Sequence, residues 1–117
     1  MDIVSIGGMR LRHWTLYFRI LWQTFAALRQ AKATPGCVTV RTFRDGNVYF
    51  ALSVWQDEAA MHHYAKSGAH GALMPRASQA MVSFYNHKYR SVSVPDNAEA
   101  AREWRAQPRS KAVEAAA

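Results

Sequence analysis

The stretch VYFALSVWQDEAAMHHYAKSGAHGALMPRASQAM, residues 48–81, joins a predicted strand to a predicted helical segment through a tight turn. Residues 48–55 carry apolar or aromatic side chains on both alternating faces, which is typical of a strand covered on both sides. Asp57 is placed to cap the following helix, which we expect to break at Ser67-Gly68 and to restart near His70. This stretch indicates the fold, but the spacing of its histidines and aromatic residues gives no complete catalytic arrangement.

The flanking residues supply the other elements. Residues 37–44 alternate like a strand, and Asp45-Gly46-Asn47 predicts a hairpin to residues 48–55. Residues 15–33 repeat apolar side chains, Phe18 and Trp22 among them, at steps of three and four, which predicts an amphipathic helix. Residues 3–12 are expected to form an edge-like first strand with a bulge or bend at Gly7-Gly8, and residues 82–94 the last strand.

The order strand, helix, strand, strand, helix, strand predicts an α+β fold of the ferredoxin-like βαββαβ type, with one antiparallel sheet. One apolar face of the sheet can pack on the chain's own helices, whereas the other needs a second cover, for which we expect a partner subunit. Residues 1–107 form the single predicted domain, including a short C-terminal helix that Asp96-Asn97 caps and that carries Trp104. Residues 108–117 have little to bury and are expected to form a flexible tail.

Composition and charge narrow the class of protein. The 117 residues include 15 Lys and Arg against 8 Asp and Glu, a formal net charge of +7. The basic residues are scattered without a nucleic-acid motif, so we do not expect nucleic-acid binding. No apolar run reaches the length of a transmembrane segment, no signal peptide is recognised, and the single cysteine, Cys37, suits a reducing compartment. These features predict a cytoplasmic protein.

Several segments carry a family resemblance. SVWQDEAAMHHYAKSGAHGALMPRA, with RLRHW upstream and VSVPDNAEAAREW downstream, resembles uncharacterised bacterial proteins of the antibiotic-biosynthesis-monooxygenase-like group, the dimeric α+β barrels. The resemblance covers about residues 9–104 and implies a homodimer that holds a small hydrophobic or aromatic ligand between sheet and helices. Members of that superfamily oxidise polycyclic phenols without a cofactor or hold haem. A partial resemblance to spheroidene monooxygenase rests on Trp55, Asp57 and residues 67–70.

Two histidines are the candidate catalytic residues. His70 could bind haem iron, and it would be the only metal ligand; alternatively it caps a helix or bonds to a backbone carbonyl. His87 lies between Tyr85 and Tyr89 on one strand face, where it could orient a phenolic or keto substrate or close a dimer interface.

The candidate pocket residues are mostly aromatic or apolar: Trp55, Tyr64, Met74, Phe50, Arg76 and Trp22. Core packing is the alternative for Trp22 and Phe50, and a solvated surface charge is the alternative for Arg76. The resemblance implies haem as the candidate cofactor. The sequence has no phosphate loop, paired cysteines, nucleophile elbow or HExxH motif, which argues against the usual nucleotide, hydrolase and structural-zinc sites. A monooxygenase-like protein is therefore predicted, and the alternative is a non-catalytic binding or dimerisation module.

Overall fold

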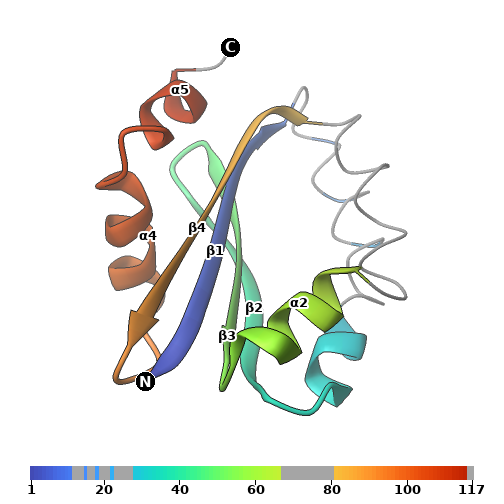
Figure 1. The fold of residues 1–117 in the computed structure, drawn as a ribbon. Coiled ribbons are helices and arrows are strands. Elements are labelled where there is room, and N and C mark those ends of the chain that lie inside the picture. Colours follow the sequence, from blue (N-terminus) through green and yellow to red (C-terminus); the bar gives the residue numbers. More distant parts are fainter. Residues whose placement is uncertain (12–14, 16–17, 19–21, 23–27, 67–80, 116–117) are drawn as a thin grey trace.

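A computed structural model places four antiparallel strands in one sheet with helices on both sides (Figure 1). It describes residues 1–11, 15, 18, 22, 28–66 and 81–115. The strands are β1 (Asp2–Leu11), β2 (Cys37–Asp45), β3 (Val48–Trp55) and β4 (Met81–Ser91), in the spatial order β2-β3-β1-β4. The helices are α2 (Glu58–Lys66), α4 (Asn97–Arg105) and α5 (Ser110–Glu114), and residues 28–33 are helical as well. The fold is ferredoxin-like α+β, as the sequence predicts.

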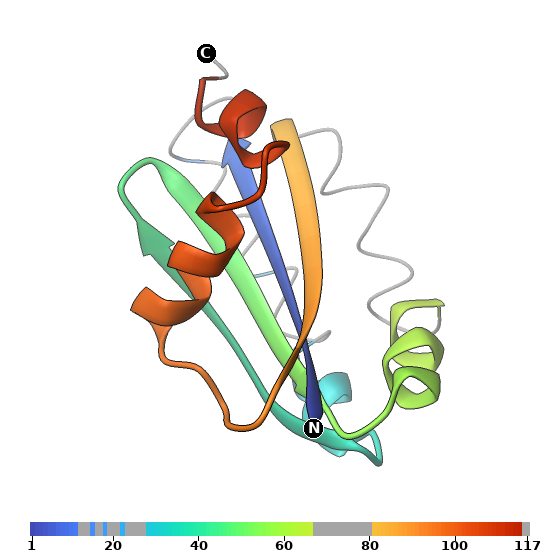
Figure 2. The ribbon, with the colours of Figure 1, turned by 60° about the vertical axis from the view of Figure 1, so that its left-hand side comes forward.

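Helices lie on opposite sides of the sheet. In Figure 1, α4 and α5 lie on one side and α2 lies on the other, and Figure 2 shows α4 running across the sheet. We call these two sides the α4 face and the α2 face. Since side chains alternate along a strand, Phe50 and Leu52 of β3 point to the α4 face, while Ala51 and Trp55 point to the α2 face.

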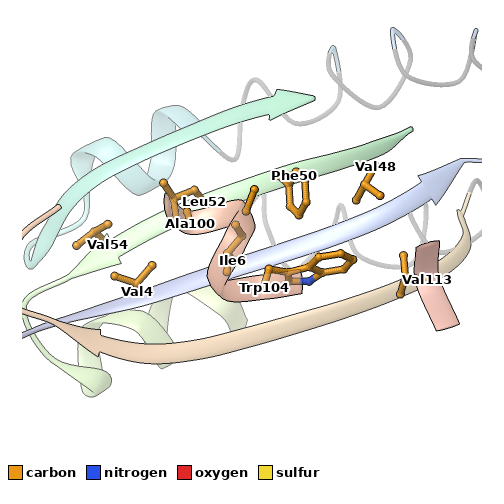
Figure 3. Close-up of a cluster of buried hydrophobic side chains, with 10 residues drawn as sticks. Val4, Ile6, Val48, Phe50, Leu52, Val54, Ala100, Trp104 and Val113 are labelled. Carbon is orange, nitrogen blue, oxygen red and sulfur yellow. The ribbon is translucent and has the colours of Figure 1, made fainter. Parts of the chain in front are cut away.

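The main core fills the space between the sheet and the C-terminal helices (Figure 3). Its buried members are Val4, Ile6, Val48, Phe50, Leu52, Val54, Ala100, Ala101, Trp104 and Val113. The sequence analysis expects a partner subunit to cover the second face of the sheet. For the α4 face this expectation is wrong, because the apolar side of α4 packs on these strands.

The first strand differs from its prediction. β1 is a central strand that pairs with β3 and β4, and its pairing runs unbroken through Gly7 and Gly8. The irregularity in register lies instead between Arg10 and Leu11. The glycines serve close packing, since a β-carbon on Gly8 would collide with the ring of Trp104. The prediction of an edge strand with a bulge at the two glycines is therefore wrong.

The turns follow their sequence signals. Gly46 has a φ of 62°, the left-handed conformation that a tight hairpin turn needs between β2 and β3. Gly36 has a φ of 93° just after the helical residues 28–33, where a β-carbon would lie 2.8 Å from that of Ala60. The last strand stops at Ser91, three residues before its predicted end at Val94.

The C-terminal region extends further into the core than its sequence indicates. Asp96 caps α4 by accepting a hydrogen bond from the backbone N–H of Glu99 at 2.8 Å. α5 follows, and it buries Ser110 and Val113. The prediction that residues beyond 107 have little to bury therefore fails for these two side chains, because the turn after α4 brings α5 back onto the end of the sheet.

Candidate functional site

The centre of the α2 face is made of small side chains. The strand register places Ala51 beside Gly7, and Ser53 beside Ser5. We call these four residues the floor. Ala51 is exposed although β3 is an inner strand of the sheet. Inner strands are normally covered on both faces, so an exposed alanine here indicates that the described residues leave space above the floor.

A buried aromatic pair lies at one end of the floor. Trp55 of β3 is fully buried, and its ring centroid lies 5.2 Å from that of Tyr64 on α2. Ile3, Ala31 and Met61 complete this second cluster. Within the described part of the chain, the indole Nε1 of Trp55 has no hydrogen-bond acceptor. A buried donor without an acceptor costs about 1–3 kcal/mol, so this N–H is a place where a ligand oxygen would be stabilised.

Local sequence explains how α2 presents Tyr64 to Trp55. Asp57 accepts a hydrogen bond from the backbone N–H of Ala60 at 2.8 Å, which fixes the start of the helix. Met61 and Tyr64 are three residues apart and therefore share the buried side of α2. His62 and His63 are exposed.

Burial keeps the titratable groups of this region protonated. Burial, with a smaller contribution from Cys37, raises the pKa of Tyr64 from 10.0 to about 12. Burial also raises the pKa of the Cys37 thiol, and Lys32 offsets part of that rise. At neutral pH Tyr64 is therefore a hydrogen-bond donor and not a base, and Cys37 is a neutral thiol rather than a thiolate.

Two of the predicted site residues lie on the opposite side of the sheet. Phe50 is 2 % exposed and packs edge-on against Trp104, with ring centroids 5.1 Å apart. His87 pairs with Ile6 of β1, which places it on the α4 face. Phe50 and His87 therefore share no pocket with Trp55 and Tyr64, because the sheet separates them.

His87 has a defined environment of its own. Its ring lies between Tyr85 and Tyr89, at centroid distances of 6.4 and 5.4 Å. Its Nε2 atom is buried and makes no hydrogen bond, although an oxygen of Glu103 approaches to 3.5 Å. Burial, together with Glu103 and Glu99, raises the pKa of Tyr89. Both tyrosines belong to the same strand as His87, so the contact of His87 with α4 is through Glu103.

Other predicted residues fall away from the floor or outside the description. Trp22 and Phe18 are helical residues with 83 % and 60 % of their surface exposed, so the alternative of core packing is wrong for Trp22. His70, Met74 and Arg76 lie outside the described residues. Within the described ranges, no three His, Cys, Asp or Glu side chains gather as a metal site would require. No described helix is long and apolar enough to cross a membrane.

The sequence prediction missed the polar residues around the floor. Asn86 of β4 pairs with Gly7, and Ser5 donates a hydrogen bond to Asn86 Oδ1 at 3.3 Å. The only sequence signal was the recurrence of small residues at alternate positions, Ser5 and Gly7 on one strand and Ala51 and Ser53 on another. These residues come together only through the pairing of the strands, which the sequence alone does not give.

A surface depression lies elsewhere, at the start of α4. It has a volume of about 610 Å³ and is lined by Arg41, Val94, Pro95, Asp96, Asn97 and Ala98. Arg41 donates hydrogen bonds to Asn97 Oδ1 and to the carbonyl of Pro95. These hydrogen bonds join β2 to the segment that precedes α4, so the polar groups of the depression have a structural role.

Comparison with known proteins agrees with this geometry. Residues 21–76 match the family model described as antibiotic biosynthesis monooxygenase. No curated protein matches the sequence significantly. The chain is an α+β protein of the ferredoxin-like class, and the matched segment, just under half of the chain, is similar to the antibiotic biosynthesis monooxygenase family.

Solved structures of the same fold have dissimilar sequences. A conserved protein from Methanosarcina mazei Go1 superposes with a TM-score of 0.71 at 13% identity, covering 78% of this chain and 93% of its own. A putative antibiotic biosynthesis monooxygenase from Nitrosomonas europaea gives 0.71 at 8% identity, covering 78% and 99%. SnoaB, a cofactor-independent oxygenase from Streptomyces nogalater crystallised as a mutant, gives 0.67 at 12% identity, covering 81% and 98%. At these identities the likeness establishes the fold alone.

Proposed function

We propose that this chain is a cytoplasmic, monooxygenase-like enzyme that binds an aromatic small molecule on the α2 face of the sheet. The buried indole N–H of Trp55, which lacks an acceptor within the described part of the chain, carries the proposal. A keto or phenolic oxygen of a ligand would accept from this N–H, while its rings would lie over the floor. The monooxygenase family match and the fold shared with SnoaB support the reaction class.

The proposed reaction uses a substrate that supplies its own electrons. In oxidation of an activated CH₂ group to a ketone by O₂, one oxygen atom enters the substrate and the other leaves as water, so the four electrons balance. The chain's part is to orient the substrate and to stabilise the anion formed when the CH₂ group loses a proton. Tyr64, protonated at neutral pH because its pKa is about 12, serves as a second donor to that anion.

The described residues do not fit haem on this face. The one thiol there, Cys37, has a raised pKa and is not in the thiolate form that binds iron. His62 and His63 point to solvent, and His87 lies behind the sheet. We therefore route no step through haem; the candidate ligand His70 remains a prediction, which a haem titration of the wild type and His70→Ala would test.

Ligand binding and oxygen uptake test the proposal separately. The probe is 1,8-dihydroxyanthrone, with binding followed by calorimetry under argon and turnover followed with an oxygen electrode. Trp55→Phe should weaken binding about tenfold, because it removes the N–H and keeps the ring, as loss of one hydrogen bond implies. Trp104→Phe removes the same group on the α4 face and should leave affinity within twofold. Absence of binding to the wild type would refute the proposal.

A non-catalytic dimerisation module is the second candidate, and the exposed aromatic pair favours it. Trp22 and Phe18 are four residues apart and strongly exposed, which is the spacing of one helix side. We propose that this side pairs two copies of the chain into a homodimer. Light scattering should give twice the chain mass of 13.2 kDa for the wild type and a single chain for Trp22→Ser. Anthrone binding without oxygen uptake would favour the module over the enzyme.

A further inference from the structure

The β4 edge of the α2 face is basic. Lys88 and Arg90 follow Asn86 at alternate positions of β4, so the three side chains share the face that carries the floor. Lys88 lies beside Ser5, and Arg90 lies beside Ile3. All three β4 side chains are exposed. The edge of the floor therefore has two cations next to an amide.

The carboxylates of the chain lie elsewhere. Asp57 and Glu58 are at the start of α2, and the other six are on the α4 side or in the C-terminal helices: Asp2, Asp45, Asp96, Glu99, Glu103 and Glu114. These eight are all the Asp and Glu that the sequence contains. Among the described residues, Arg105 makes ion pairs with Asp45 and Glu114, whereas Lys88 and Arg90 make none. The positive charge at this edge is not neutralised by the chain itself.

The neighbouring polar groups are donors as well. Ser5 donates to Asn86 Oδ1, which occupies the amide oxygen and leaves the Nδ2 group of Asn86 free to donate. Trp55 Nε1, on the same face, is the buried donor that lacks an acceptor within the described chain. The β4 edge, which offers N–H groups and cations without a carboxylate, is complementary to an anionic oxygen group.

We propose that the ligand of the α2 face is an aromatic carboxylate, whose rings lie over the floor and whose carboxylate is bound by Lys88 and Asn86, with Arg90 adding charge. This inference rests on the proposed function and specifies its substrate class. The ammonium of Lys88 and the amide of Asn86 each take one carboxylate oxygen. Because these groups are exposed at the edge, their attraction is screened by salt, and binding should weaken as ionic strength rises.

A matched pair of ligands tests the inference. The probes are 1-hydroxy-2-naphthoate and its neutral amide, 1-hydroxy-2-naphthamide, which share rings and phenol and differ in charge. The full-length wild type should bind the acid at least tenfold more tightly than the amide. Lys88→Gln should abolish most of this preference and leave the affinity for the amide within twofold. Arg102→Gln removes an equal charge from exposed α4 and should keep the preference intact.

The outcomes separate this inference from the function it rests on. If the wild type binds acid and amide equally, or if Lys88→Gln keeps the preference for the acid, the carboxylate site is wrong while aromatic binding stands. If Lys88→Gln and Arg102→Gln lower acid binding alike, the effect is one of net charge, and the site is again wrong. If the wild type binds neither probe nor the anthrone, the proposed function and this inference fall together.

Discussion

The ring of Trp104 lies directly over Gly8, at a separation that leaves no room for a β-carbon. The indole Nε1 of Trp104 donates a hydrogen bond to the carbonyl of Tyr85 at 2.9 Å, on the strand next to Gly8. The backbone of one central strand is thus the contact surface for the largest side chain of α4. This contact joins the C-terminal helix to the sheet, and the stability of the α4 face depends on it.

Gly8→Ala should therefore destabilise the protein by about 1–3 kcal/mol, the range for overpacking a core. The new methyl group would press on Trp104 and would lie 3.0 Å from Phe50, and both side chains are buried. Gly7→Ala is the matched control: its methyl group would meet Phe84, which is 42 % exposed and can move aside. Urea unfolding measures both variants, and equal losses would contradict the assignment.

Trp104→Ala should cost about 3–5 kcal/mol, as large-to-small changes of buried aromatic residues do. The cavity would open between Phe50 and Gly8 and leave the Tyr85 carbonyl without its donor. Val92→Ala, at an 84 % exposed valine, should change the free energy of unfolding by less than about 0.5 kcal/mol. A Trp104→Ala protein as stable as the Val92 variant would show that α4 does not pack on the sheet in solution.

Arg105→Lys should cost about 1–2 kcal/mol, because lysine cannot reproduce the planar fork of arginine. Arg105 pairs with Asp45 at the hairpin and with Glu114 on α5, and its guanidinium lies 5.7 Å from the centre of the Phe50 ring. The exposed Arg102 on the same helix is the control, and Arg102→Lys should be neutral. Thermal unfolding at low and high salt measures both, and the difference between the variants should shrink as salt rises.

Stability should fall above about pH 10 through Tyr64. The pKa of Tyr64 is about 12 in the folded protein against 10.0 in the reference, so between these values the folded state holds a proton that the unfolded state has released. Unfolding is then favoured progressively as pH rises through this window, and Tyr64 contributes no change in stability below it. Urea midpoints of wild type and Tyr64→Phe, compared from pH 8 to 11.5, should show a smaller alkaline loss in the variant. Equal losses of stability at alkaline pH in the wild type and in Tyr64→Phe would show that Tyr64 is not the cause.

Strand and turn signals predicted much of this fold because they are local. The β2–β3 hairpin follows from alternation on either side of Asp45-Gly46-Asn47, and the capped starts of α2 and α4 follow from Asp57 and Asp96. Each of these depends on residues a few positions apart, so the printed sequence contains all the information needed. The order of these elements predicted the topology, and the family resemblance agrees with it.

Phe50 and Trp55 are five residues apart on one strand, and this odd spacing places them on opposite faces already in the sequence, although the prediction counted both as pocket residues. Tertiary structure alone decided which helices cover each face and which residues of other strands share it. Ser5, Asn86 and Lys88 meet only because β1 and β4, far apart in sequence, pair in one register. The cover of the α4 face was likewise decided by packing, since local patterns cannot say whether an apolar face meets the chain's own helices or another molecule.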